Sequence, residues 1–372
     1  MNKDLDRLLS ESLTSVQESY ATERQADRIE ARARFIERYR RRRRRLMIGS
    51  VALAGAAVIG LGVVATQGFD IFAGPSRVAG QPEDLPRGVL AQIGTGDQAV
   101  DAGIQSGGVW VANAGDQTLS RVDAATNEVL DQIELDGPPQ EVDVGEGGVW
   151  VAGFGRVTAL DPDTGEVLGM ADLGSADDSI SISVGEGAVW AVVGDRSLYR
   201  VDPESFEAQE VAAVSAPVDV AARDGAVWVL DQDQGLLQLD PGTGDAVGEP
   251  LPDVPGRGDI SAGQGVVWIG NKQDDTLLRI DAATRDISGV FQVTGTYIDM
   301  AVSETVIWVL SRTNEDARLT ALDPNSNGEV LGTLRISGDP VEVSAGQTGL
   351  WVVSRGRGAL LRVDADAVLQ PN

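Results

Sequence analysis

Residues 107–135 read GGVWVANAGDQTLSRVDAATNEVLDQIEL, and variants of this pattern recur along the chain. Each copy contains one tryptophan, in a setting such as GGVWVA, GEGAVWAV or TGLWVV, and consecutive tryptophans lie 38 to 43 residues apart. The seven tryptophans are Trp110, Trp150, Trp190, Trp228, Trp268, Trp308 and Trp351. A fixed period of about 40 residues indicates that one supersecondary unit is repeated around a larger architecture.

An aspartate follows each tryptophan by 11 to 15 residues. It stands before turn residues, as in TALDPDTGEV, so we expect its carboxylate to close an Asx turn. The DPDTGE stretch lacks the twelve-residue ligand spacing and the final glutamate of a calcium loop, which argues against calcium binding there. The seven aspartates are Asp123, Asp161, Asp202, Asp240, Asp281, Asp323 and Asp364.

Within one period, alternating apolar residues predict four short strands. In the second repeat these are EVDVG (141–145), GVWVAG (148–153), RVTALD (156–161) and EVLGMADL (166–173). Four strands per period, repeated seven times, predict an all-β fold, a seven-bladed β-propeller with four-stranded blades. The tryptophans are then expected to pack between neighbouring blades.

The two ends of the repeat region are expected to meet. The last repeat supplies three strands, near 340–345, 349–354 and 359–364, while GVLAQI at 88–93 matches EVLDQI at 128–133, the fourth-strand stretch of the first repeat. The N-terminal strand should therefore complete the last blade and remove the free sheet edges.

The repeat resembles the YVTN-type propellers and the streptogramin (virginiamycin B) lyase-like propellers, and the resemblance covers about residues 87–368. It implies a seven-bladed propeller. For the lyases it also implies a metal-assisted ring-opening elimination that relies on a catalytic histidine. The chain contains no histidine, so the resemblance carries the fold and not the reaction.

Composition narrows the chemistry further. The absence of both histidine and cysteine excludes imidazole bases, thiol nucleophiles and disulfides. The net charge of −27 divides into +5 for residues 1–45 and −32 for residues 46–372. So acidic a region repels phosphate backbones, which argues against a nucleic-acid partner. The simplest role for the surplus acid is solubility.

The N-terminal quarter predicts a membrane anchor. Twenty uncharged residues from Leu46 to Ala65 are long enough to span a bilayer, which places a transmembrane helix at 46–66. A signal peptide would have a shorter apolar core, nearer the start. The arginines 40–45 precede this stretch, which favours a cytoplasmic N-terminus, although such a run also matches a nucleic-acid patch. The propeller would then lie outside the cytoplasm as part of a single-pass cell-membrane protein.

Three smaller predictions concern the same region. Residues 1–45 suggest a charged helical cytoplasmic tail, with docking to a cytoplasmic regulator as an alternative, and 67–86 an irregular linker before the propeller at 87–368. Ala52, Ala56 and Gly60 form a small-xxx-small stripe that would allow helix-mediated dimerisation.

A ring of acid is predicted at the start of the innermost strands. Nine residues before each tryptophan stand Asp101, Glu141, Ser181, Asp219, Asp259, Asp299 and Glu342. One interpretation is a negatively charged funnel for a cation or basic group, in which crowding raises some carboxyl pKa values. The other is structural, with each carboxylate accepting a backbone N–H from the adjacent blade. Basic loop residues on the same face are Lys272, Arg312, Arg355 and Arg357, which would orient an anionic partner or balance charge.

A complete scaffold without recognisable catalytic groups favours a non-catalytic binding module for a protein, a cell-wall component or a small ligand. Two alternatives stay open. One is a lyase or hydrolase that uses a carboxylate-bound divalent cation, for which no other cofactor is indicated. The other is a transmembrane sensor that signals through residues 1–45.

Overall fold

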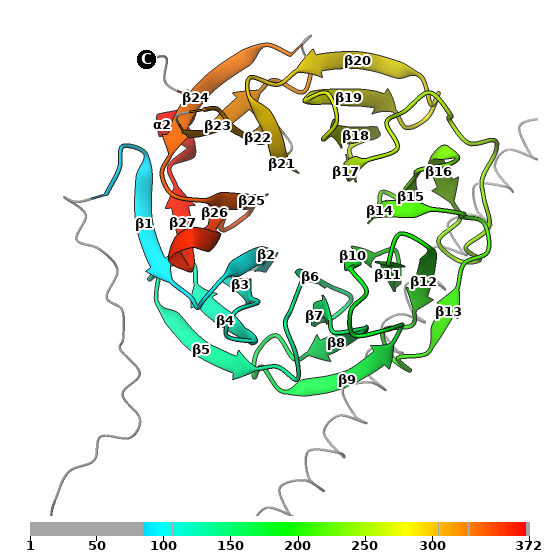
Figure 1. The fold of residues 1–372 in the computed structure, drawn as a ribbon, viewed down its shortest axis with the longest axis horizontal. Helices are drawn as coiled ribbons and strands as arrows, with labels where there is room; N and C mark the ends of the chain where they lie inside the picture. The colour runs from blue at the N-terminus through cyan, green and yellow to red at the C-terminus, as the bar shows by residue number, and fades with distance from the viewer. Residues whose placement is uncertain (1–84, 106, 304, 315, 326–327, 370–372) are drawn as a thin grey trace, which may run out of the picture. The chain divides into compact units, whose positions relative to one another are not determined.

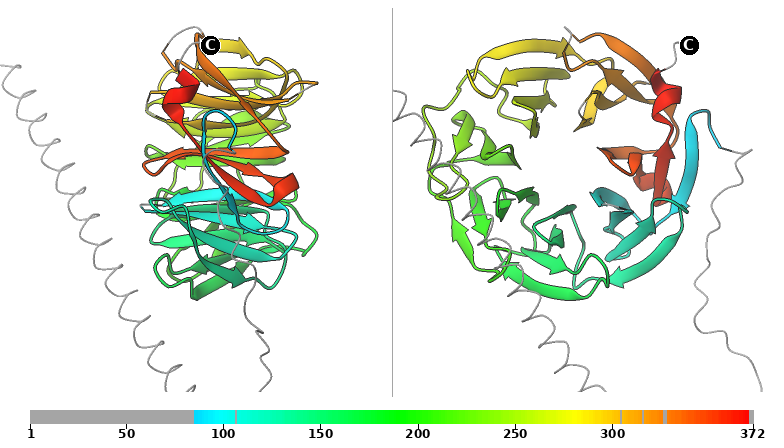
Figure 2. Two further views of the ribbon diagram at one scale, coloured as in Figure 1. Left: turned by 90° about the vertical axis from the view of Figure 1, so that its left-hand side faces the viewer. Right: turned by 180° about the vertical axis from the view of Figure 1, so that it is seen from behind.

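Seven antiparallel sheets radiate from a common centre, each lying beside the next around a closed ring (Figure 1). The computed structural model describes residues 85–369, apart from 106, 304, 315 and 326–327. Adjacent innermost strands contact one another all the way around the ring, including the last with the first. Figure 2 shows the same ring edge-on and from behind. The seven-bladed β-propeller predicted from the repeats is thus confirmed.

In each blade, the three inner strands run outward in sequence order. The innermost strands are β2 (Ala99–Gln105), β6 (Glu141–Gly145), β10 (Ile180–Gly185), β14 (Pro217–Arg223), β17 (Gly258–Gly263), β21 (Thr296–Val302) and β25 (Pro340–Gly346). The second strands, which carry the tryptophans, are β3 (Gly108–Asn113), β7 (Gly148–Gly153), β11 (Ala188–Val193), β15 (Ala226–Asp231), β18 (Val266–Asn271), β22 (Ile307–Arg312) and β26 (Gly349–Ser354). The third strands are β4 (Thr118–Asp123), β8 (Arg156–Leu160), β12 (Ser197–Val201), β16 (Gly235–Leu239), β19 (Thr276–Asp281), β23 (Ala317–Leu322) and β27 (Ala359–Val363).

Outer strands complete six of the seven blades. They are β5 (Val129–Glu134), β9 (Val167–Asp172), β13 (Ala208–Glu210), β20 (Ile287–Gln292), β24 (Val330–Ile336) and β1 (Val89–Gly94). The fourth blade has three strands, and only the single bridges Leu236–Leu251 and Leu239–Ala246 stand where its outer strand would be. Pro250 and Pro252 lack the backbone N–H that a strand needs, so the prediction of four strands in every blade is corrected here.

The ring closes as predicted, through the pairing of the first strand with the last blade, which we call the clasp. Strand β1 pairs with β27 in the order β1-β27-β26-β25, so the first strand is the outer strand of the last blade. Registers such as Ile93 with Leu360 bury both side chains. A short helix, α2 (Ala365–Leu369), then packs on the outer strands of blade six. Closure of this kind leaves no sheet edge between the first and last blades.

The core lies between blades, and the tryptophans fill it. All seven are at most 5% exposed. Trp110 of the first blade, for example, clusters with Val142 and Val149 of the second. Trp351 of the last blade clusters with Val109 and Val111 of the first. Each large flat side chain therefore joins its own blade to the next, as expected from the sequence.

The repeated aspartates close turns, as predicted. Oδ1 of Asp202 accepts hydrogen bonds from the backbone N–H groups of Glu204 (2.9 Å) and Ser205 (2.8 Å). Equivalent bonds reach Asp123, Asp161, Asp240, Asp281, Asp323 and Asp364. These aspartates therefore have a structural role in the turns, as the sequence analysis expected in preference to calcium binding.

The predictions for the N-terminal region require correction. In the part of the chain that the structure describes, no helix is long and apolar enough to cross a membrane. Its α-helix, α2, has five residues, whereas a bilayer crossing needs about 20. The predicted transmembrane helix at 46–66, the helical tail at 1–45 and most of the linker at 67–86 lie outside the described residues. The described residues therefore form a propeller without a membrane-spanning helix, and they do not support the predicted single-pass membrane localisation.

Candidate functional site

The predicted ring residues converge on one cavity at the centre of the propeller. All seven line a space of about 880 Å³, which we call the channel mouth: Asp101, Glu141, Ser181, Asp219, Asp259, Asp299 and Glu342. Asp195, Gln232 and Lys272, from loops between second and third strands, line it too. The inner-strand starts and these loops thus share one face, as the sequence indicated. A second space of about 270 Å³ lies against Asp101, Glu141 and Asp219 as well.

Backbone bulges place four of the ring residues. The pairing between the first and second strands slips by one residue immediately before Asp101, Asp219, Asp299 and Glu342. A β-bulge re-aims the side chain beside it. The bulged residues, Val100, Val218, Ile298 and Val341, also line the channel mouth. Sequence reasoning missed these bulges because alternation of residue types does not record the hydrogen-bond register.

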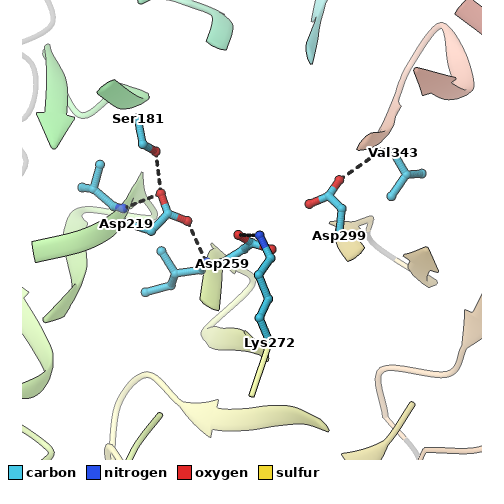
Figure 3. Close-up of polar contacts among 8 residues, drawn as sticks. Ser181, Asp219, Asp259, Lys272, Asp299 and Val343 are labelled. Carbon is cyan, nitrogen blue, oxygen red and sulfur yellow. Dashed lines mark hydrogen bonds and ion pairs between the residues drawn. The ribbon is translucent and has the colours of Figure 1, made fainter. Parts of the chain in front are cut away.

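Four ring carboxylates each accept a hydrogen bond from a backbone N–H of the next blade. The backbone N–H of Val142 donates to Oδ2 of Asp101 (2.6 Å), and that of Ile182 donates to Oε2 of Glu141 (2.9 Å). Likewise Asp219 accepts from Ile260 (2.9 Å) and Asp299 from Val343 (2.8 Å). Asp219 also accepts a hydrogen bond from the Ser181 hydroxyl at 2.7 Å (Figure 3). The structural interpretation of the ring therefore applies to these four residues.

Asp259 and Glu342 differ from the other four, because neither accepts a hydrogen bond from a backbone N–H of the next blade among the described residues. Oδ1 of Asp259 accepts from Nζ of Lys272 at 2.6 Å, while its buried Oδ2 has no hydrogen-bond partner among the described residues. The buried hydroxyl of Tyr297 interacts with the Asp259 carboxylate and opposes the rise in the pKa of that carboxyl, although no hydrogen bond of ordinary geometry joins the two groups. Burial, and next the charge of Asp259, raise the pKa of Tyr297 well above its usual value. The buried polar atoms at this corner of the ring therefore lack well-formed hydrogen bonds.

Glu342 is linked to the first blade through a serine. Oγ of Ser344 lies 2.7 Å from the carbonyl oxygen of Ala102 and makes a second, short contact with Oε1 of Glu342. A serine hydroxyl has one proton to donate, so if Ala102 receives it, Glu342 must supply the proton of the other bond. Burial, together with the charges of Asp101 and Asp299, raises the pKa of Glu342 well above its usual value, which agrees with a protonated carboxyl.

The whole ring holds protons more tightly than ordinary carboxylates do. Burial, the largest cause in each case, raises the pKa of Asp101 to about 7, that of Asp219 to about 6 and that of Asp299 to about 8. The charge of Asp259 adds to the effect on Asp219 and Asp299. Burial also raises the pKa of Glu141, with the charges of Asp101 and Asp219 as further causes. A cation that entered the mouth would favour the charged forms and displace protons.

The predicted basic loop residues separate into two groups. Lys272 lines the channel mouth and faces the ring, and its pKa is raised by the charges of Asp259, Asp299 and Asp219, which outweigh its burial. Arg312 instead pairs with Asp339 at 2.6 Å, and neither residue lines the mouth. Arg355 and Arg357 belong to the short 3-10 helix η2 (Arg355–Arg357), and Arg355 does not line the mouth. Arg257, which the sequence did not single out, lines the mouth as well.

The donor set does not converge as a metal site would. Within the described residues, no group of three or more acidic side chains is placed to hold a metal ion. The carboxylates are instead distributed around an opening several times larger than one ion. The arrangement is suited to an extended cation that meets several carboxylates at once.

Comparison with known proteins establishes a class and no particular family. These features define a β-propeller with an acidic channel mouth. No family model and no curated protein matches the sequence. Among solved structures, BamB from Moraxella catarrhalis is similar over 71% of this chain and 85% of its own, at 14% identity and a TM-score of 0.51.

Raptor from Chaetomium thermophilum is similar over 73% of this chain but only 28% of its own length, at 14% identity and a TM-score of 0.61. At such identities the likeness extends to the fold alone. The resemblance to YVTN-type and streptogramin lyase-like propellers therefore stays a prediction.

Proposed function

We propose that this propeller is a non-catalytic binding module whose channel mouth receives a cationic group of its partner, such as a lysine or arginine side chain of a protein. The observation that carries the proposal is the ring itself, in which six carboxylates from six blades border one cavity. Among the described residues, Lys272 is the cation that donates a hydrogen bond to one of them, Asp259. An acidic cleft of this kind attracts and orients positive groups.

The fixed positions of the carboxylates support the same proposal. Four of the six carboxylates already stabilise the scaffold through backbone N–H groups, which fixes their positions before any ligand arrives. Preorganised acceptors spare a ligand the cost of ordering them. Among the described residues, Oε2 of Glu342 is buried without a hydrogen-bond donor, and Oδ2 of Asp259 lacks a well-formed hydrogen bond despite its interaction with Tyr297. A guanidinium or ammonium group would supply donors to both.

Calorimetric titration of the full-length chain with spermidine and with a tri-arginine peptide tests the proposal. We expect saturable binding at pH 7.5 that weakens at least tenfold in a double variant, Asp259→Asn with Glu342→Gln. In the part of the chain that the structure describes, no backbone N–H of the next blade donates to either side chain, so the variant should fold. The double variant Asp131→Asn with Glu134→Gln, on the exposed outer strand β5, removes the same two kinds of carboxyl group away from the mouth and should bind normally. Equal loss in the control would reduce the effect to nonspecific charge attraction.

An enzymatic role, in the manner of the streptogramin lyases, is the second candidate. The crowded carboxyls with raised pKa values are the observation in its favour, because general acids often have such values. The missing histidine and the dispersed carboxylates weigh against transferring the lyase reaction. Metal-dependent turnover of a cyclic ester, abolished by Asp219→Asn, would favour the enzyme over the binding module.

A further inference from the structure

A separate cavity of about 610 Å³ lies at the seam between blade six and the clasp, on the outer side of the ring. We call it the seam pocket. It shares no lining residue with the channel mouth. Its polar lining consists of hydrogen-bond donors: the guanidinium groups of Arg87, Arg318 and Arg335 and the hydroxyls of Thr333 and Ser337. None of the described residues that line it is acidic, although residues 46–372 carry a formal net charge of −32.

Two of the arginines face each other directly. Arg318 of β23 and Arg335 of β24 are paired in the antiparallel register, so their side chains stand on the same face of the sheet. Like charges in that position destabilise a sheet unless an anion lies between or beside them. Arg335 has an ion pair with Asp316 at 3.1 Å, but with 66% and 34% of the two side chains exposed, water screens much of that attraction.

Arg318 is the half-buried member of the pair. Its Nε atom is buried and has no hydrogen-bond partner among the described residues. A buried donor without an acceptor is costly, and more so when it belongs to a charged group. An oxyanion in the seam pocket would provide that acceptor.

Close packing at two glycines positions the segments that line the seam pocket. Gly88, with φ of +76°, leaves no room for a side chain beside Leu334, so the segment before β1 approaches β24 closely. Gly332 of β24 similarly lies against the backbone of Val368 in α2. Both glycines bring the clasp and the helix onto blade six, which fixes the pocket before any ligand binds.

We propose that the seam pocket binds a small multivalent oxyanion, either a phosphate ester or a polycarboxylate. Three guanidinium groups present paired N–H donors that match the geometry of carboxylate and phosphate oxygens. The two hydroxyls add donors without adding charge. This inference does not depend on the proposed function, because it concerns another face of the propeller and a ligand of opposite charge.

Calorimetric titration of the full-length chain with inorganic phosphate and, separately, with citrate at constant ionic strength tests the proposal. We expect one saturable site per chain for at least one anion, with affinity at least tenfold lower in Arg318→Gln and in Arg335→Gln. Arg196→Gln, whose arginine is 75% exposed on blade three, is the matched control and should bind as the native chain does. A phosphate-only response assigns a phosphate ester, and a citrate-only response a polycarboxylate.

Two results would overturn the proposal: no saturable binding of either anion, or binding that both pocket variants retain. If Arg318→Gln fails to fold, Arg335→Gln decides alone, since its side chain is mostly exposed. Arg335→Lys supplies a finer check, because it keeps the charge but loses the paired donors, and we expect it to bind more weakly than the native chain.

Discussion

Oδ2 of Asp299 accepts the backbone N–H of Val343 at 2.8 Å, so a carboxylate of blade six holds the innermost strand of blade seven. The same carboxylate is buried beside Asp259, and these two causes raise its pKa to about 8. One side chain therefore stabilises the ring by its hydrogen bond and destabilises it by its charge. These two effects can be separated by substitution.

Asp299→Asn keeps an oxygen acceptor and removes the charge, whereas Asp299→Ala removes both. We expect Asp299→Asn to be at least as stable as the native chain at pH 8. We expect Asp299→Ala to lose about 1–3 kcal/mol at pH 5, because the N–H of Val343 is left without its acceptor. Urea unfolding of the three proteins at both pH values measures this. Equal stabilities for the two variants at pH 5 would show that the hydrogen bond contributes nothing.

The ring also predicts how stability depends on pH. Asp101, Asp219 and Asp299 have folded-state pKa values of about 7, 6 and 8, above their ordinary value of 3.8. These carboxyls bind protons more tightly in the folded protein than in the unfolded chain. Their contribution to the free energy of unfolding is therefore fully present below pH 3.8 and is lost as pH rises through about 8. We expect the urea midpoint to fall steadily between pH 5 and pH 8. A midpoint that rises over this range would contradict the raised pKa values.

The fold was predictable from the sequence because its markers are local. Each tryptophan and each turn aspartate recurs at nearly the same place in its repeat, and those positions have the same neighbours in every blade. The ring residues were found together for the same reason, since equivalent positions of a closed repeat must lie around one axis. The missing fourth strand near Pro250 and Pro252 departs from the repeat, and averaging over repeats concealed it.

The individual roles within the site were not predictable in the same way. Bulges before Asp101 and Asp299 depend on the register between two strands, and the pairing of Lys272 with Asp259 depends on the path of one loop. The seam pocket arises where β24 meets the clasp, which occurs once and leaves no periodic signal. The predicted membrane helix has no counterpart in the described residues, where no helix is long and apolar enough to cross a membrane.

Asp231, a residue that the sequence did not single out, is predicted to be important for the fourth blade. Its fully buried carboxylate accepts four backbone N–H groups: Oδ2 from Ser215 and Ala216 at 2.8 Å each, and Oδ1 from Asp233 at 3.0 Å and Gln234 at 2.9 Å. These bonds tie together a blade that has no outer strand. Their combined effect exceeds that of burial and lowers the pKa of Asp231.

Asp231→Asn offers one oxygen where two are needed, so we expect it to lose about 3 kcal/mol at pH 7, nearly as much as Asp231→Ala. Because the folded pKa is lowered, the native advantage exists above the unfolded pKa and shrinks as pH falls through the folded value. Chemical unfolding at pH 7 and pH 3 measures both effects. Asp202→Asn, in the turn after the third strand of blade three, keeps the acceptor of two backbone bonds and should cost less.

Lys272 is predicted to compete with the ligand of the channel mouth. Its Nζ forms an ion pair with Oδ1 of Asp259 at 2.6 Å, and 48% of the lysine side chain is exposed. An incoming cation therefore meets a ring whose negative charge is already partly neutralised. We expect Lys272→Ala to bind spermidine up to about fivefold more tightly, as the loss of a pair worth about 1 kcal/mol implies. Without ligand, the variant should be less stable, since Asp259 then lacks its partner.

The pH dependence of binding separates competition from a general change in charge. A cation displaces protons from the ring, so affinity should rise from pH 6 to pH 8 in both proteins. The advantage of Lys272→Ala should persist across that range, because the lysine stays charged throughout it, its pKa being raised by the ring. Calorimetry in two buffers with different ionisation enthalpies measures affinity and proton release together. Weaker binding by Lys272→Ala would show that Lys272 takes part in holding the ligand instead of opposing it.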